Sequence, residues 1–167
     1  MTDADGSTVS DTFDVTVTAV NDAPGFTKGP DQSVQEDAGS QSVAGWATAI
    51  SAGPSDESSQ SLNFIVSNDN NALFSVQPAV SSDGTLSYTP ASNASGTATV
   101  TVELHDSGGT SNGGDDTSAP QTFVITVTGV NDPPQLANLG GTANYTEDST
   151  ATPLSVAATV SDLELDA

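Results

Sequence analysis

A near-repeat separated by 110 positions constrains this chain more than any other feature of its sequence. The segment VNDAP at residues 20–24 returns as VNDPP at residues 130–134. The residues before each copy repeat as well, because FDVTVTA at 13–19 corresponds to FVITVTG at 123–129. A fixed period of this size is typical of an array of similar domains.

Acidic pairs follow both copies of the junction. Glu36-Asp37 follows the first copy, and Glu147-Asp148 follows the second copy 111 positions later. Each junction therefore combines oxygen-bearing side chains with a proline, as a stiff linker clamped by a metal ion would require. The repeat predicts three parts of the chain: the last strand of a preceding repeat (1–20), a complete repeat (21–131) and the first strands of a following repeat (132–167).

The charge of the chain excludes several classes of partner. The 167 residues include 22 acidic side chains, one lysine and no arginine, giving a formal net charge of −21. With one basic side chain the protein cannot neutralise phosphates, so we expect neither nucleic acid nor an anionic membrane surface as a partner. No segment approaches the roughly 20 apolar residues of a membrane span, so no membrane insertion is expected. The chain should instead attract cations.

Apolar and polar residues alternate with a period of two, which favours β-strands over the disorder that high net charge can cause. The turn signal Ser81-Ser82-Asp83-Gly84 predicts a hairpin between two of the strands. Seven short strands between Pro24 and Val130 predict an all-β, antiparallel sandwich of immunoglobulin-like type. The expected strands are 25–35, 41–50, 62–66, 73–76, 85–88, 99–104 and 123–128.

Strand direction sorts the candidate ligands between the two ends of this sandwich, because successive strands run in opposite directions. The end facing the preceding repeat receives Asn21, Asp22, Asp56, Glu57 and Asp106. The opposite end receives Glu36, Asp37, Asn131 and Asp132, with Asp69 and Asn93 as further candidates. The following repeat adds Glu147, Asp148, Asp162 and Glu164. Like charges gathered in this way repel one another unless a cation lies between them.

Calcium is the cation that suits these side chains. Ca²⁺ takes 6–8 oxygen ligands from carboxylates, amides, carbonyls and water. The chain has one histidine, His105, and no cysteine, so it lacks a ligand set for zinc or redox metals. Solvated loop acids are the alternative interpretation, and the recurrence of Asn-Asp and Glu-Asp at the same place in two repeats favours calcium. Without disulfides, a metal is also the natural means of stabilising an extracellular domain.

The junction resembles the linker of cadherin repeats, Asp-x-Asn-Asp-Asn-x-Pro-x-Phe. Residues 19–26 (AVNDAPGF) keep the Asn-Asp pair, the proline and the aromatic residue. Over nearly the whole chain, including GTLSYTP at 84–90, the sequence is similar to the bacterial cadherin-like tandem repeat of large adhesins. This resemblance implies a Greek-key sandwich in tandem repeats with calcium bound at the linkers between them.

The resemblance also assigns individual ligands. Glu36 and Glu147 take the place of the family's strand-A acid, and 162–164 (DLE) takes the place of its Asp-x-Asp. Ala19 stands where the family has its first linker aspartate, and residues 91–96 lack its Asp-Arg-Glu element. We therefore expect one or two ions at each junction. Since the upstream partner of the first junction is missing from the sequence, Asn131-Asp132 is the favoured calcium site.

These features predict a calcium-rigidified, extracellular and non-enzymatic stalk of a bacterial adhesin-like protein, whose partners are the neighbouring repeats. The alternative is a module that binds cell-surface polysaccharide or another cell-surface protein through a loop end or a sheet face. Trp46 is either a sugar platform or, as we expect, a core residue, and His105 is expected to be a polar loop residue rather than a catalytic one. The incomplete ends are expected to be frayed or paired with a neighbouring chain.

Overall fold

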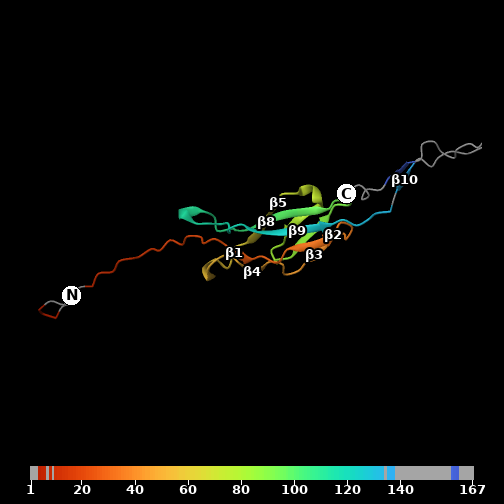
Figure 1. The fold of residues 1–167 in the computed structure, drawn as a ribbon. Helices are drawn as coiled ribbons and strands as arrows, with labels where there is room; N and C mark the ends of the chain where they lie inside the picture. The colour runs from red at the N-terminus through yellow and green to blue at the C-terminus, as the bar shows by residue number, and fades with distance from the viewer. Residues whose placement is uncertain (1–3, 7, 9, 134, 138–158, 162–167) are drawn as a thin grey trace, which may run out of the picture.

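The computed structural model describes residues 4–6, 8, 10–133, 135–137 and 159–161. The described chain is all-β, apart from the single-turn 3₁₀ helices η1 (Ser55–Glu57), η2 (Asn71–Leu73) and η3 (Ser111–Gly113). Figure 1 shows an elongated body, with an extended N-terminal segment running away from one end. The chain leaves the body at the opposite end, toward β10. We call residues 10–20 the arm.

The body is built from two main sheets. The larger has the order β2-β9-β8-β5, comprising Gln32–Gln35, Gln121–Thr128, Gly96–Asp106 and Leu62–Asn68. The smaller has the order β3-β7-β6, comprising Gln41–Val43, Leu86–Pro90 and Phe74–Val80. Two further pairs are β1 (Gly25–Thr27) with β4 (Thr48–Ser51), and β10 (Gln135–Ala137) with β11 (Thr159–Ser161). Every pairing is antiparallel except that of β2 with β9, which is parallel.

The predicted all-β architecture is confirmed, and each expected strand has a counterpart. One pairing departs from the predicted antiparallel arrangement, because β2 and β9 are parallel. The first two expected strands are each divided in two. The interruption between β1 and β2 contains Pro30, which has no N–H to donate to a ladder. The interruption between β3 and β4 turns at Gly45, whose φ of +64° suits glycine. The predicted hairpin turn is also present, since the Gly84 N–H donates to the Ser81 carbonyl at 2.8 Å.

The core lies between the two main sheets and follows from the alternation of residues along their strands. In β8, the inward side chains from Ala98 to Leu104 are at most 1% exposed, and Ile125 of β9 is fully buried. From the other side, Trp46 is 3% exposed and packs on Phe123 with ring centroids 4.4 Å apart. Its indole N–H donates to the Pro30 carbonyl at 3.0 Å. The shared core is consistent with a β-sandwich, and the prediction that Trp46 is a core residue is confirmed.

Truncation in this core should be far more costly than truncation on its outer surface. Leu104→Ala removes a side chain with no exposed surface, so we expect the free energy of unfolding to fall by about 2–5 kcal/mol. Ile65 is 46% exposed on β5, and Ile65→Ala should cost about 1 kcal/mol or less. Urea unfolding followed by circular dichroism measures both values. Equal losses in the two variants would contradict this description of the core.

The β6–β7 turn contains a carboxylate whose ionisation can be measured directly. The Ser81 hydroxyl holds the pKa of Asp83 below its ordinary value of 3.8, and the Thr85 backbone N–H adds to the effect. Ionised Asp83 therefore stabilises the turn above its unfolded-state pKa, and this contribution is lost as the pH falls through the folded pKa. Ser81→Ala should raise the pKa of Asp83 in an NMR titration. Ser82→Ala serves as the control and should leave it unchanged.

Candidate metal centre

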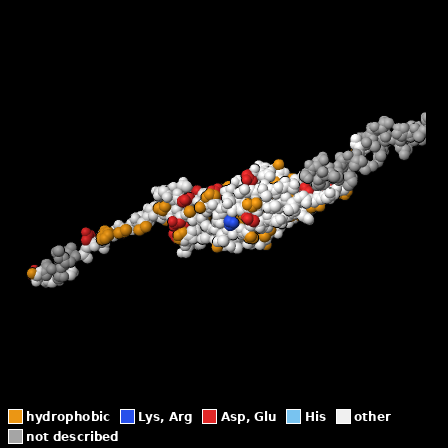
Figure 2. All heavy atoms as spheres, in the orientation of Figure 1, with side chains coloured by type: hydrophobic (Ala, Val, Ile, Leu, Met, Phe, Trp, Pro, Cys, Tyr) orange, Lys and Arg blue, Asp and Glu red, His pale blue; other side chains and the backbone are white. Residues whose placement is uncertain are grey.

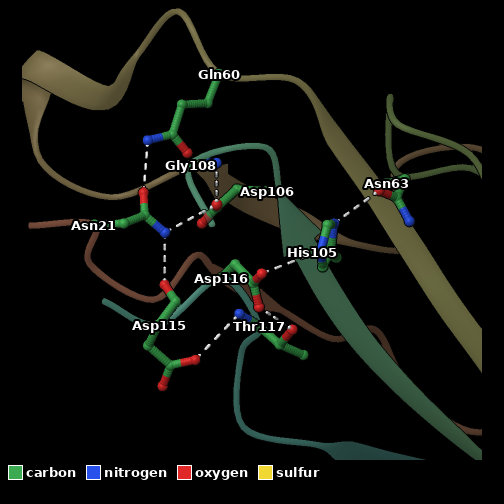
Figure 3. Close-up of polar contacts among 9 residues, drawn as sticks. All are labelled: Asn21, Gln60, Asn63, His105, Asp106, Gly108, Asp115, Asp116 and Thr117. Atoms are coloured by element: carbon green, nitrogen blue, oxygen red, sulfur yellow. Dashed lines mark hydrogen bonds and ion pairs between the residues drawn. The ribbon is translucent and has the colours of Figure 1, made fainter. Parts of the chain in front are cut away.

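Asn21 is the residue at which the arm is attached to the body. Its side-chain Nδ2 donates to Asp106 Oδ1 at 3.0 Å and to the Asp115 carbonyl at 2.7 Å. Its Oδ1 accepts from Gln60 Nε2 at 2.6 Å, and its carbonyl accepts from the Asp115 N–H at 3.0 Å. Figure 3 shows the Asn21 amide between these partners. One amide therefore links the entering chain to the loop after η1 and to the loop between β8 and β9.

Asp22, the next residue of the junction, forms a hydrogen bond with Glu57. The Asp22 backbone N–H donates to Glu57 Oε1 at 2.9 Å, and the Glu57 side chain is 8% exposed. Glu57 ends the 3₁₀ helix η1, which follows a glycine and a proline. Gly53 has a φ of +145°, and a Cβ at this position would collide with the Glu57 carboxylate. The local sequence therefore leaves room for the carboxylate to fold inward against the linker.

Asp106 ends strand β8 and is fully buried. Its Oδ1 accepts from the Gly108 N–H at 2.8 Å in addition to the Asn21 amide. A Cβ at Gly108 would collide with the Asn21 side chain, so a glycine is needed for this close approach. Strand β8 thus ends in a carboxylate placed directly beneath the incoming linker.

Three oxygens in this cluster are buried without a hydrogen-bond donor among the described residues: Glu57 Oε2, Gln60 Oε1 and Asp106 Oδ2. The amide orientations follow from the network. Asn21 Nδ2 faces two acceptors, so Oδ1 must receive Gln60 Nε2, and Gln60 Oε1 is left over. A buried carboxylate oxygen without a partner is destabilising, because the protein does not replace its lost hydration. A cation bound to such an oxygen would offset that cost.

A pocket of about 220 Å³ opens beside Glu57 and Gln60, although not beside Asp106, and supplies the space that an ion and its waters need. Its lining includes Asn21, Glu57, Gln60 and Gly108, together with Asp56 and the arm residues Ala19 and Val20. In the described part of the chain, no group of three or more histidine, cysteine, aspartate or glutamate side chains is placed to hold a metal. An ion here would therefore need the Gln60 amide, main-chain oxygens or water beside two carboxylates. That oxygen-only chemistry fits Ca²⁺.

The structure brings together four of the five residues expected at this end: Asn21, Asp22, Glu57 and Asp106. Asp22 takes part through its backbone N–H, and the residue is exposed. The fifth, Asp56, is exposed at the pocket. Sequence reasoning missed Gln60 and Asp115. Gln60 carried a usable signal, because it lies on the same loop as Glu57 and can offer an amide oxygen.

At the opposite end, Glu36 holds the chain as it leaves the body. Glu36 is 4% exposed, and its Oε1 accepts from the Val130 N–H at 2.7 Å. Its own N–H donates to the Thr128 carbonyl at 3.1 Å. Of the other residues expected here, Asp37 and Asn131 are exposed and Asp132 is half-buried. Glu36 is therefore a positioning residue for the exit linker, and it remains a predicted ligand.

The remaining candidates either have other contacts in the structure or lie outside the described residues. Asp69 Oδ1 accepts from the Thr99 N–H at 2.7 Å, and Asn93 is exposed in a turn with φ of +56°. His105 lies in strand β8, paired with Asn63, so the prediction of a loop position is wrong. Its Nδ1 lies 3.2 Å from Asn63 Oδ1, and its Nε2 lies 3.6 Å from Asp116 Oδ2 (Figure 3). The candidates outside the described residues are Glu147, Asp148, Asp162 and Glu164.

No protein-family model matches the sequence, and no curated protein matches it. The cadherin-like resemblance therefore remains a prediction from the junction and its surroundings. In the described residues, no helix is long and apolar enough to cross a membrane.

Because the Asp106 carboxylate is buried, we expect its replacement to stabilise the protein when no metal is bound. Asp106→Asn keeps an oxygen for Asn21 and Gly108 and replaces the unpartnered, charged Oδ2 with a neutral amide nitrogen. In chelator, we expect it to raise the free energy of unfolding by about 1 kcal/mol or more. Glu103→Gln removes one charge from the partly exposed face of the same strand and should change stability less. Chemical denaturation measures both, and a lower stability for Asp106→Asn in chelator would contradict the interpretation.

Proposed function

We propose that the chain is a calcium-rigidified, extracellular β-sandwich repeat that serves as a non-enzymatic spacer in an adhesin-like protein. The observation that carries the proposal is the pair of buried carboxylates, Asp106 and Glu57, each with one unpartnered oxygen at the point where the arm joins the body. The recurrence of the junction 110 residues later supports the tandem arrangement. The Greek-key, cadherin-like form of the sandwich belongs to the same proposal.

The mechanism is mechanical. Asn21 and Asp22 belong to the linker, whereas Asp106 and Glu57 belong to loops of the body, and hydrogen bonds already connect the two sets. A cation bound to the free carboxylate oxygens would neutralise charge that otherwise pushes these loops apart. The linker would then keep one direction relative to the body, so that successive repeats form a semi-rigid rod.

The charge of the chain supports a cation-dependent role outside the cell. With a formal charge of −21, the surface concentrates divalent cations. In Figure 2, acidic side chains lie on the body near the arm, and the basic side chain that is visible farther along the body lies beside another acidic group. Extracellular calcium modules bind with dissociation constants of about 10⁻⁴–10⁻³ M, so such a site fills outside the cell and is empty in the cytoplasm.

Calcium should stabilise the protein measurably. At a concentration about ten times its dissociation constant, a ligand bound only to the folded state adds about 1.4 kcal/mol. We expect thermal melts in calcium to shift upward relative to chelator, and small-angle scattering to show a narrower range of dimensions as the arm becomes fixed. Unchanged melting and unchanged dimensions would refute the proposal.

Matched variants show which carboxylates are responsible for the calcium-dependent shift in melting. Asp106→Asn and Glu57→Gln should each abolish most of the calcium-dependent shift, whereas Glu103→Gln should retain it. Glu36→Gln tests the opposite end separately. An equal calcium response in all four variants would indicate general screening of negative charge rather than a site.

A further inference from the structure

The arm carries an exposed apolar stripe that the cation proposal does not use. Phe13, Val15 and Val17 are 85%, 73% and 87% exposed, and polar residues alternate with them. The arm forms no strand in the described structure, although alternation of this kind is the pattern of a strand with one buried face. Figure 2 shows the apolar side chains along the segment that runs away from the body.

The stripe has an apolar counterpart at the same spacing inside the body. Phe123, Ile125 and Val127 of β9 lie 110 positions later, and they are 2%, 0% and 2% exposed. The junction that follows is the same in both places, Val-Asn-Asp-x-Pro. The same pattern of apolar side chains is therefore buried in the body and largely exposed in the arm.

The surroundings of β9 specify what would cover the arm. β9 lies between β8, which is antiparallel to it, and β2, which is parallel to it. Its pairing with β2 runs from Ile125, opposite Gln32, to Thr128, opposite Gln35. Just beyond, the Val130 N–H donates to Glu36 Oε1, and Val20 is the matching residue of the arm.

We propose that residues 12–18 are a strand donated to another β-sandwich of the same sheet order. In that sandwich, the position between the strands equivalent to β2 and β8 is open. Phe13, Val15 and Val17 enter the core of that sandwich, and an acidic side chain of the partner accepts the Val20 N–H. The corresponding position in the chain's own body is filled by β9. Addition of a strand in this way combines backbone hydrogen bonds with pockets for alternate side chains.

Other occupants fit the stripe less well. The spacing of two is that of a strand, so a groove that receives a helix would not bury all three side chains on one face. The arm contains Asp11 and Asp14 and no basic residue, which disfavours an anionic bilayer. The proposal rests on strand pattern and sheet order alone, so it does not depend on calcium.

The test uses an acceptor made from the full chain. In this acceptor, Phe123→Asp, Ile125→Asp and Val127→Asp prevent β9 from packing into the core. Val15→Asp prevents the acceptor's own arm from taking the place of β9. Three peptides are then added: residues 10–20, the same peptide with Val15→Asp, and residues 120–130 as a positive control. Circular dichroism follows the recovery of β structure, and fluorescence anisotropy of labelled peptides gives the affinity.

We expect the 10–20 peptide to restore β structure as the 120–130 peptide does, and to bind about tenfold or more tightly than its Val15→Asp form. Both measurements are made in chelator, so that loss of a calcium effect cannot imitate failure here. Restoration by 120–130 without restoration by 10–20 would overturn the proposal, as would equal binding of the two arm peptides.

Discussion

The burial of alternate side chains along β8 and β9 is the constraint on which the rest of the structure depends. Their inward residues are 0–2% exposed, so neither strand can shift by one residue without turning its apolar face to solvent. This fixed register determines where each strand ends. Asp106 lies beneath the entering linker because β8 ends there, and Val130 meets Glu36 because β9 ends there. The core thus sets the positions of the carboxylates at both ends.

The two ends use their buried carboxylates differently. Glu36 accepts the Val130 N–H and thereby fixes the exit of the chain. At the entry, Asp106 and Glu57 each use one oxygen to hold the linker, and each keeps the other oxygen without a donor among the described residues. At the entry, the unpartnered carboxylate oxygens have lost their hydration without gaining a hydrogen bond, which lowers the stability of the protein. A bound cation would offset this loss.

Much of the fold could be predicted from the sequence because period-two alternation reports directly on strands that are buried on one face. Strand β8 and the turn at Ser81–Gly84 are examples. The breaks near Pro30 and Gly45 were not predicted, because the flanking residues still look extended. Sorting loops by strand direction correctly placed Asn21 close to Asp106, 85 positions apart. It could not identify Gln60, since only the three-dimensional network shows which amide oxygen is left without a partner.

The parallel pairing of β2 with β9 has a consequence for a molecule under tension. The chain enters the body at one end and leaves it at the other, and these two strands run in the same direction between the ends (Figure 1). Pulling on the two linkers therefore draws β2 and β9 past each other along their length. All the hydrogen bonds between Gln32–Gln35 and Ile125–Thr128 are then loaded in shear and must break together, rather than opening one after another. This geometry suits a segment that transmits force along its axis.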